Sequence, residues 1–360
     1  MNASVAISAD GNTAVIGSPT DNGQNGSVSI FARTGITWSQ QGGKLSPSDA
    51  QGLAHFGASV AISADGNTAV IGGSFDNMGR GAAWVFTRST GLWTQQGPKL
   101  LGTGSVAIPG QGSAVAVSAD GATIMVGGSG DNYSTGAVWV FVNAGFGWSQ
   151  QGSKLVGTGG VSPFVSQGSA LAISADGSTA IIGAKGDNKS TGAAWIFART
   201  GGIWTQQGDK LVGTGAAAAA NQSFAVSISS NGDTVLLGRP LDNGGAGAAW
   251  VFTRSNGIWA QQGDKLTGVG AEGTAHQGAS AALSGDGNTA VFGGPNDNYL
   301  KGAAWVFKRS GGVWTQQGDK VTGTGNGGFQ GSSLALTPDT CTLLVGGGAD
   351  AWVFVGPAQQ

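Results

Sequence analysis

A short turn motif recurs along this chain at a nearly constant interval. Its anchor residues are Asp10, Asp65, Asp120, Asp176, Asn231, Asp286 and Asp339, separated by 55, 55, 56, 55, 55 and 53 residues. Asp-Asn pairs that begin at Asp21, Asp76, Asp131, Asp187, Asp242 and Asp297 recur at the same interval. Such a period indicates repeats of one structural unit. Although a length of 360 residues is compatible with two domains, we therefore expect a single domain over residues 1–360.

Each copy contains four segments with the character of β-strands. In the second copy, residues 58–64 and 68–73 are rich in Val, Ile and Ala, and Asp65-Gly66-Asn67 between them is a strong hairpin signal. Residues 81–88 give a third strand, and the LWTQQG segment that ends at Gly97 gives a fourth. No window shows a sustained helical period. The chain is thus predicted to be an all-β, seven-bladed β-propeller of four-stranded antiparallel blades, with the first strands next to the central channel.

The seventh copy is shorter than the others. The expected blades span approximately residues 1–45, 46–100, 101–155, 156–211, 212–266, 267–321 and 322–360. The last of these ranges lacks the Trp-Thr-Gln-Gln segment that forms the expected fourth strand elsewhere. We therefore predict an incomplete, three-stranded seventh blade. The ring then closes by apolar packing between blades one and seven rather than by a shared sheet.

Charge and composition exclude several classes of partner. The net charge of -2 leaves no excess of cations for phosphates or anionic lipids, so we expect neither nucleic acid nor a membrane surface as a partner. No apolar run is long enough to insert into a membrane. A single Cys forms neither an intrachain disulfide nor a cysteine zinc site. The chain opens on an expected strand, without a signal-peptide pattern.

The second copy carries a recognisable set of residues. Phe56-Gly57-Ala58, Asp65-Gly66, Val70-Ile71-Gly72-Gly73 and Trp84-Val85-Phe86 together resemble the FG-GAP repeat, and the likeness extends over nearly the whole chain. That family builds the propeller of integrin α subunits and of many bacterial surface and secreted proteins. The resemblance implies an extracellular or cell-surface location and a role in adhesion. We expect a monomer.

The resemblance does not extend to calcium. Calcium-binding members of the family carry a D-x-D-x-D-G type of loop between the first two strands. Here that loop is shortened to ADGN or a close relative with one carboxylate, whereas calcium takes about 6 to 8 oxygen ligands. We therefore predict no metal and no cofactor.

The Asp-Asn pairs are one candidate binding site. They are Asp21, Asn22, Asp76, Asn77, Asp131, Asn132, Asp187, Asn188, Asp242, Asn243, Asp297 and Asn298. We expect them between strands two and three, on the same rim as the long loops that join consecutive blades. A ring of such pairs suits hydroxyl-rich or cationic ligands. Alternatively, Asp and Asn stabilise turns by hydrogen bonding to the nearby backbone.

The 12 Trp residues fall on two repeat positions. Those in the third strand are Trp84, Trp139, Trp195, Trp250, Trp305 and Trp352, and those in the fourth are Trp38, Trp93, Trp148, Trp204, Trp259 and Trp314. Either the rings fill the space between blades, or the fourth-strand set forms an exposed platform for sugar rings. The arginines that end the third strands (Arg33, Arg88, Arg199, Arg254 and Arg309) and the lysines of the G-x-K-L segments (Lys44, Lys99, Lys154, Lys210, Lys265 and Lys320) are interpreted as solvated edge residues.

Catalytic patterns are absent from the sequence. His55 and His276 occupy equivalent positions several blades apart, and the unrepeated Arg239, Glu272 and Lys185 are not brought together by any spacing. We therefore predict a non-enzymatic binding or adhesion scaffold with multivalent recognition of a glycan or an extracellular protein through the loop rim. One alternative is a structural repeat module of a larger surface protein with no ligand of its own. Another is a hydrolase or lyase that uses the central channel.

Overall fold

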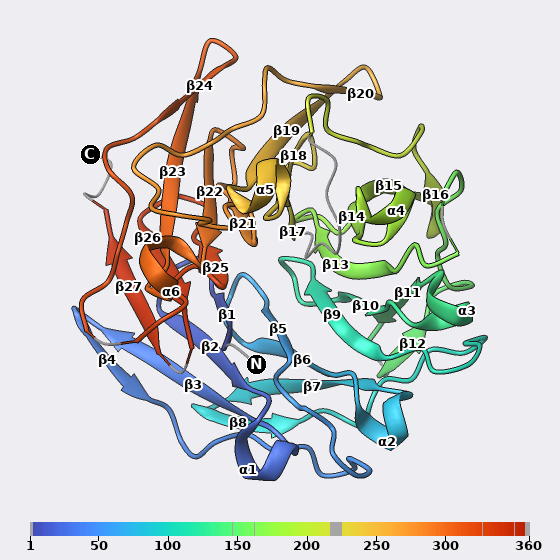
Figure 1. The fold of residues 1–360 in the computed structure, drawn as a ribbon. Coiled ribbons are helices and arrows are strands. Elements are labelled where there is room, and N and C mark those ends of the chain that lie inside the picture. Colours follow the sequence, from blue (N-terminus) through green and yellow to red (C-terminus); the bar gives the residue numbers. More distant parts are fainter. Residues whose placement is uncertain are drawn as a thin grey trace.

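Seven small sheets form a ring in the computed structural model, which describes residues 3–145, 147–161, 163–216, 225–325, 327–348 and 350–356. Figure 1 views this ring from one end. Six sheets have four antiparallel strands in chain order and the seventh has three. The predicted all-β, seven-bladed propeller with an incomplete seventh blade is therefore confirmed.

The strands occupy equivalent positions in each blade. The first strands are β1 (Ser4–Ile7), β5 (Ser59–Ile62), β9 (Gln111–Val117), β13 (Gln167–Ile173), β17 (Ala225–Ile228), β21 (Ser280–Leu283) and β25 (Ser333–Leu336). The second are β2 (Thr13–Ser18), β6 (Thr68–Gly73), β10 (Thr123–Gly128), β14 (Thr179–Ala184), β18 (Thr234–Arg239), β22 (Thr289–Gly294) and β26 (Thr342–Gly346). The third are β3 (Ser27–Thr34), β7 (Ala82–Ser89), β11 (Ala137–Asn143), β15 (Ala193–Thr200), β19 (Ala248–Ser255), β23 (Ala303–Ser310) and β27 (Ala351–Val355). The fourth are β4 (Thr37–Gln40), β8 (Leu92–Gln95), β12 (Trp148–Gln150), β16 (Ile203–Gln206), β20 (Ile258–Gln261) and β24 (Val313–Gln316).

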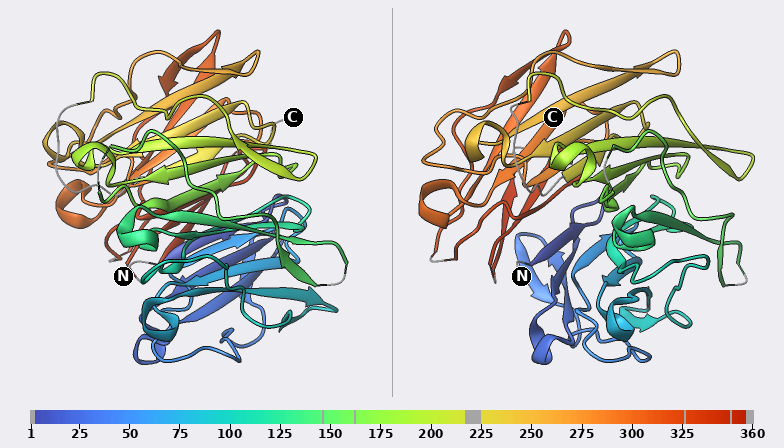
Figure 2. Two further views of the ribbon diagram at one scale, coloured as in Figure 1. Left: turned by 90° about the vertical axis from the view of Figure 1, so that its right-hand side faces the viewer. Right: turned by 45° about the vertical axis from the view of Figure 1, so that its right-hand side comes forward.

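One helical turn separates the second strand from the third in blades one to six. These turns are α1 (Asp21–Gln24), α2 (Asp76–Gly79), α3 (Asp131–Ser134), α4 (Asp187–Ser190), α5 (Asp242–Gly245) and α6 (Asp297–Leu300). In the side views of Figure 2 they gather toward one side of the ring, and the tips of the outer hairpins point toward the other. The two rims of the propeller therefore differ in structure.

The Ser-x-Asp-Gly sequence after a first strand explains the first hairpin turn. In blade two the Ser63 hydroxyl donates to an Asp65 carboxylate oxygen (2.5 Å), and the Asn67 N–H donates to the same oxygen (3.0 Å). Gly66 has a φ of 68°, which glycine adopts without steric cost. Burial raises the pKa of Asp65, but the hydrogen bonds from Ser63 and Asn67 outweigh burial, so the pKa lies below its ordinary value.

Acid is expected to destabilise the fold through these turns. The pKa is also lowered at the turn residues Asp10, Asp176, Asp286 and Asp339. A carboxyl whose pKa is lower in the folded state stabilises that state above its unfolded value of about 3.9, and the contribution is lost as the pH falls through the folded value. The free energy of unfolding, measured with urea, should therefore fall as the pH is lowered below about 4.

Asp65→Asn provides the matched variant. Asn231 already occupies this position in blade five, where its side-chain oxygen accepts the equivalent bonds from Ser229 and the Asp233 N–H. The difference in unfolding free energy between the wild type and Asp65→Asn should shrink between pH 6 and pH 3. A difference that stays constant over this interval would show that Asp65 does not contribute to the acid sensitivity.

Backbone hydrogen bonds join the first turns of neighbouring blades. The residue before each turn anchor donates its N–H to the equivalent carbonyl of the next blade over 2.9–3.0 Å, from Ala9 to Ala64, then to Ala119, Ala175, Ser230, Gly285 and Pro338. Pro338 has no N–H, so blade seven cannot donate the corresponding bond to blade one. The ring of turn bonds is therefore open at one position.

The cores lie between the blades and are built on the third-strand Trp rings. Trp84, Trp139, Trp195, Trp250 and Trp305 are at most 2% exposed, which confirms their structural interpretation. In blade two, Trp84 packs in one cluster with Ile30 and Phe56, and its indole N–H donates to Asp49 (2.7 Å). A Cβ on Gly102 would overlap the ring of Trp139, so the recurrent Gly of the L-x-G-T-G segment provides room for the ring.

Apolar packing closes the ring between blades one and seven, as predicted. Val5, Ala14 and Leu344 form its buried core, with Trp38 and Val353 packed against them. Hydrogen bonds also cross this interface beside the cluster, from the Ala3 N–H to the Gly347 carbonyl (3.2 Å) and from the Val5 N–H to the Ser333 hydroxyl (3.1 Å). The strands of blade seven and blade one belong to separate sheets.

Candidate functional site

The Asp of each Asp-Asn pair is buried in blades two to six, and in blades two, three, four and six it joins two loop segments. In blade two, one carboxylate oxygen of Asp76 accepts the Gln51 N–H from the entering loop (2.6 Å). The other accepts from the Lys99 ammonium in the segment that leaves the blade (2.6 Å). These four Asp residues therefore lie on the same rim as the loops between blades, and each binds two loop segments together.

The same ion pair recurs in all six blades that have an Asp-Asn pair. The nitrogen–oxygen distances are 2.7 Å for Lys44–Asp21, 2.6 Å for Lys99–Asp76, 2.5 Å for Lys154–Asp131, Lys210–Asp187 and Lys265–Asp242, and 2.7 Å for Lys320–Asp297. The Asp side chains are at most 1% exposed in blades two to six and 29% exposed at Asp21. Five of the six candidate carboxylates thus face protein rather than the solvent at the rim.

Asp21 is the accessible member of the set. Hydrogen bonds from the Lys44 ammonium and the Ser27 hydroxyl, with a further bond from the Asn22 N–H, lower its pKa to about 2. Its carboxylate is therefore ionised throughout the physiological range of pH.

The Asn of each pair makes a left-handed turn. Asn22, Asn77, Asn132, Asn188, Asn243 and Asn298 have φ values of 46–50°. Asn tolerates this region better than most residues. The six Asn side chains are exposed or half-buried at the surface of the rim.

The residue after each Asn is the most exposed part of the rim, and the sequence did not predict it as a binding residue. Gly23, Met78, Tyr133, Lys189, Gly244 and Tyr299 occupy this position, and all six have positive φ. Met78, Tyr133 and Tyr299 are 90%, 73% and 95% exposed. Both Tyr residues of the chain stand at this position, and that coincidence in the sequence could have indicated a binding role.

Further apolar side chains flank these tips. Phe75, Ile108 and Phe164 are 52–64% exposed and lie in the turns before α2, β9 and β13. Between α6 and the residues 322–325, 327, 328 and 330 lies a groove of about 660 Å³, lined by Asn298, Tyr299 and several Gly residues. The rim therefore combines exposed rings, amide groups and a hollow.

The fourth-strand Trp rings are half-buried between blades. The indole N–H donates to a Gln of the preceding blade in five cases, namely Trp93 to Gln41, Trp148 to Gln96, Trp204 to Gln151, Trp259 to Gln207 and Trp314 to Gln262, over 2.8–3.1 Å. Arg33, Arg88, Arg199, Arg254 and Arg309 stack over the rings of Trp38, Trp93, Trp204, Trp259 and Trp314 at 5.3–5.8 Å. One ring face and the polar edge are thus already engaged.

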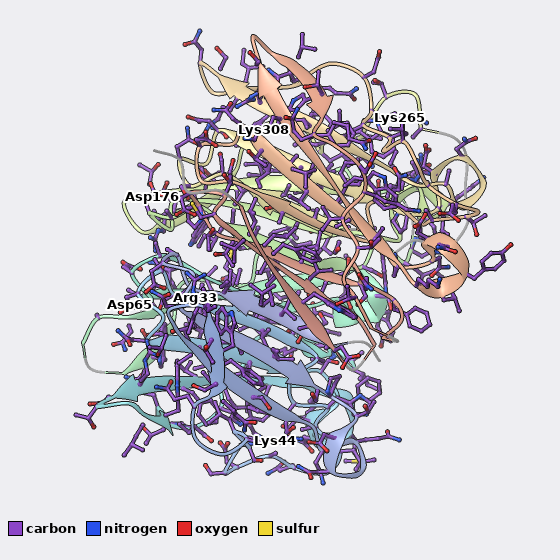
Figure 3. The ribbon with its side chains drawn as sticks, turned by 90° about the vertical axis from the view of Figure 1, so that its left-hand side faces the viewer. Arg33, Lys44, Asp65, Asp176, Lys265 and Lys308 are labelled. Carbon is purple, nitrogen blue, oxygen red and sulfur yellow. The ribbon has the colours of Figure 1, made fainter. Side chains whose placement is uncertain are left out.

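The interpretation of the cations as solvated edge residues is wrong except at Lys44, whose side chain is 53% exposed. The ammonium groups of the lysines bind the Asp residues of the Asp-Asn pairs, because burial of a carboxylate requires a partner. Arg88 donates to Thr13 and Gln41 of blade one, so its guanidinium joins two blades. Figure 3 shows Arg33 on the same side of the ring as Asp65 and Asp176, whereas Lys44 and Lys265 lie toward the other side.

The unrepeated polar residues lie in three separate blades. Arg239 ends β18 and is 3% exposed, and burial lowers its pKa. Glu272 pairs with Lys320 (2.9 Å), and Lys185 is exposed after β14. In the part of the chain that the structure describes, no group of three His, Cys, Asp or Glu side chains is placed to hold a metal ion. No helix among the described residues is long and apolar enough to cross a membrane.

Comparisons with known proteins agree with this architecture. The family model of the FG-GAP repeat matches residues 38–86. No curated protein sequence matches the chain. Among solved structures, Kuenenia stuttgartiensis hydrazine synthase is similar with a TM-score of 0.64 over 99% of this chain and 96% of that chain, at 13% identity, which shows a shared fold alone. The repeat match over residues 38–86 and the seven blades together support the similarity of this chain to FG-GAP repeat β-propellers.

Proposed function

We propose that this propeller is a non-enzymatic binding scaffold that recognises a glycan or an extracellular protein through the rim of α1–α6 and the loops between blades. The supporting observation is the exposure of Met78, Tyr133 and Tyr299 at the tips of left-handed turns. Left-handed backbone costs a non-glycine residue about 1–2 kcal/mol. Bulky residues held there, with their side chains in solvent, are consistent with selection for contact rather than for folding.

The groove beside α6 suits a ligand with hydroxyl groups and one apolar face. Tyr299 offers a ring at its edge, and Asn298, Thr322 and Thr324 offer polar groups along its wall. Sites of this kind combine apolar surface with a few placed hydrogen-bonding groups. A sugar ring or a polar side chain of a protein loop satisfies both requirements.

Variation between blades favours one broad binding surface over six equal sites. The tip residue is Gly in blades one and five, Met in blade two, Tyr in blades three and six, and Lys in blade four. Any multivalency would therefore come from the unlike sites of blades two, three, four and six. Linked weak sites of this kind raise the overall affinity without any new contact.

The test compares two pairs of exposed side chains. Tyr133→Ala/Tyr299→Ala removes the two rings from the rim, and the control Ile203→Ala/Ile258→Ala removes aliphatic groups of 68% and 72% exposure from the opposite hairpin tips. Binding is measured on immobilised glycans and on immobilised extracellular matrix proteins. We expect the tyrosine variant to lose about ten-fold or more in affinity, because interface aromatics contribute most to binding, and the control to bind as the wild type.

Two outcomes contradict the proposal. If the wild type binds neither panel, the chain is better described as a structural module of a larger surface protein. If both variants weaken binding equally, the ligand does not use this rim.

A further inference from the structure

In blades one, two, four, five and six, an Arg near the end of the third strand joins two blades. In blade two, the guanidinium carbon of Arg88 lies 5.4 Å from the ring centroid of Trp93. The same group donates to the Thr13 hydroxyl (3.1 Å) and to the Gln41 side-chain oxygen (3.3 Å) of blade one. Its Nε–H donates to the Asn67 side-chain oxygen (2.9 Å). One ring face and three acceptors thus form a binding site for one guanidinium group.

The Trp ring and the Thr acceptor recur at each of these Arg residues. The guanidinium carbon lies 5.3–5.8 Å from the ring centroid in all five blades. A terminal guanidinium nitrogen donates over 3.1–3.5 Å to a Thr hydroxyl of the neighbouring blade. The Thr residues that accept these bonds are 1–4% exposed, and they are Thr342, Thr13, Thr123, Thr179 and Thr234.

Blade three has the same site without the Arg. Asn143 stands at the Arg position, since it lies opposite Trp148 across β11 and β12 as Arg88 lies opposite Trp93 across β7 and β8. The short Asn143 side chain accepts the Gly145 N–H of its own turn (2.9 Å). Among the described residues, no Arg or Lys lies over the Trp148 ring.

The acceptors of blade three are in place. Trp148 donates its indole N–H to the Gln96 side-chain oxygen (3.0 Å), as Trp93 does to Gln41. Thr68 occupies the Thr position, but it is half-buried, whereas the five Thr residues that accept from an Arg are at most 4% exposed. The change from Arg to Asn therefore leaves Thr68 partly open to solvent.

A carboxylate beside the Arg position of blade three also lacks its usual partner. In blade two, the second carboxylate oxygen of Asp65 accepts the Asn67 amide (3.0 Å). Ala122 stands at the Asn position of blade three, and among the described residues no group donates to the second oxygen of the exposed Asp120. The Arg88 guanidinium interacts electrostatically with Asp65. A cation at the Arg position of blade three would be attracted by Asp120 in the same way.

A groove of about 600 Å³ lies beside Trp148. Gln96, Phe141 and Lys99 line it together with the Trp ring. The Lys99 ammonium is bound by Asp76 (2.6 Å), so it does not occupy the place of the Arg. The ring and the Gln acceptor of blade three are therefore accessible to a ligand.

We propose that the Arg position of blade three binds the guanidinium group of a ligand from outside the chain. The group stacks on the Trp148 ring and donates to Gln96 and Thr68, and the Asp120 carboxylate attracts its charge. A guanidinium fits better than an ammonium because its planar fork stacks on a ring and donates to two acceptors at once.

This site lies away from the rim of α1–α6. Arg33 is its counterpart in blade one, and in Figure 3 Arg33 lies on the same side of the ring as Asp65. Lys44, which binds Asp21 of α1, lies toward the other side. The inference therefore does not rest on the proposed function, and substitutions at one site should leave binding at the other unchanged.

The probe is the peptide Gly-Gly-Arg-Gly-Gly, and its control has citrulline, a neutral residue of the same shape, in place of Arg. Heteronuclear NMR of the full chain follows the indole N–H signal of Trp148, assigned by its loss in Trp148→Phe. We expect the Arg peptide to shift this signal saturably. The citrulline peptide should bind at least about five-fold more weakly, because it lacks the charge of the cation–π contact and of the hydrogen bonds.

Methylguanidinium distinguishes two sources of the ligand. Tighter binding of the Arg peptide than of methylguanidinium would indicate an arginine side chain of a partner protein. Equal affinities would indicate a small guanidinium compound.

Asn143→Arg restores the residue that five other blades carry, and it should abolish binding of the Arg peptide. Ser149→Arg is the matched control, because it adds the same charge at an exposed position of β12 whose side chain points to the opposite face from Trp148. This control should bind as the wild type does. Arg88→Ala should create a second site, so that the indole signal of Trp93 also responds to the peptide.

Three results would overturn this assignment. They are absence of a saturable shift of the Trp148 signal, equal binding of the Arg and citrulline peptides, and binding by Asn143→Arg that equals binding by the wild type.

Discussion

Replacing Asp76 with Ala is expected to lower the free energy of unfolding by about 3–5 kcal/mol, because the substitution leaves the Lys99 ammonium without its carboxylate in a buried position. The side chains of Asp76 and Lys99 are 0% and 10% exposed. The loop N–H of Gln51 also loses its acceptor. Urea unfolding monitored by circular dichroism measures the change.

Blade one contains the matched control. Asp21 and Lys44 form the same pair, with side chains 29% and 53% exposed. Exposed ion pairs contribute about 0–1 kcal/mol, so Asp21→Ala should cost far less than Asp76→Ala. Equal losses in the two variants would show that burial of the pair is not the source of the effect.

The second large effect is expected at Gly81. This residue has a φ of 70° and forms a parallel bridge with Gln111 of the next blade. A Cβ there would overlap the backbone oxygen and nitrogen of Gln111, so Gly81→Ala must separate two blades. We expect a loss of about 3 kcal/mol or more in unfolding free energy, since neither backbone can yield without breaking the bridge.

Gly91→Ala is the control that separates the clash of a new Cβ with a neighbouring blade from the cost of a positive φ. Gly91 has a φ of 82°, but a Cβ on this residue would meet no other atom within 4 Å. Its replacement should cost only the left-handed strain of about 1–2 kcal/mol. If Gly91→Ala destabilises the protein as much as Gly81→Ala does, the contact with Gln111 is not the cause.

The sequence was sufficient for the fold because the same hairpin signals repeat seven times. The second copy predicted strands at 58–64, 68–73 and 81–88, and the structure has them at Ser59–Ile62, Thr68–Gly73 and Ala82–Ser89. A turn with Asp and Gly fixes its own geometry through bonds two residues apart. Local chemistry of this kind can be recognised in a single sequence.

The candidate site was harder to predict because its main interactions connect segments distant in sequence. The Asp residues were assigned to ligand binding or to turn formation, and their pairing with Lys was missed. Asp76 and Lys99 are 23 residues apart, and the same spacing separates the partners in the other five blades. A constant spacing between opposite charges was therefore the signal in the sequence. The tip residues could be recognised only by the lack of a repeat. Tyr133 and Tyr299 stand at a position where the residue type differs from blade to blade, whereas the Asp and Lys positions are constant.

Pro338 has a consequence for how the ring comes apart. A closed ring of equal blades has no preferred first break, because loss of one interface leaves every blade still held on its other side. Here the interface between blades seven and one lacks a turn bond, and its buried core is confined to Val5, Ala14 and Leu344 among the described residues. In its order of unfolding, the molecule should therefore behave as a linear array with two ends, and β1 and β25 should exchange their amide hydrogens earlier than the other first strands.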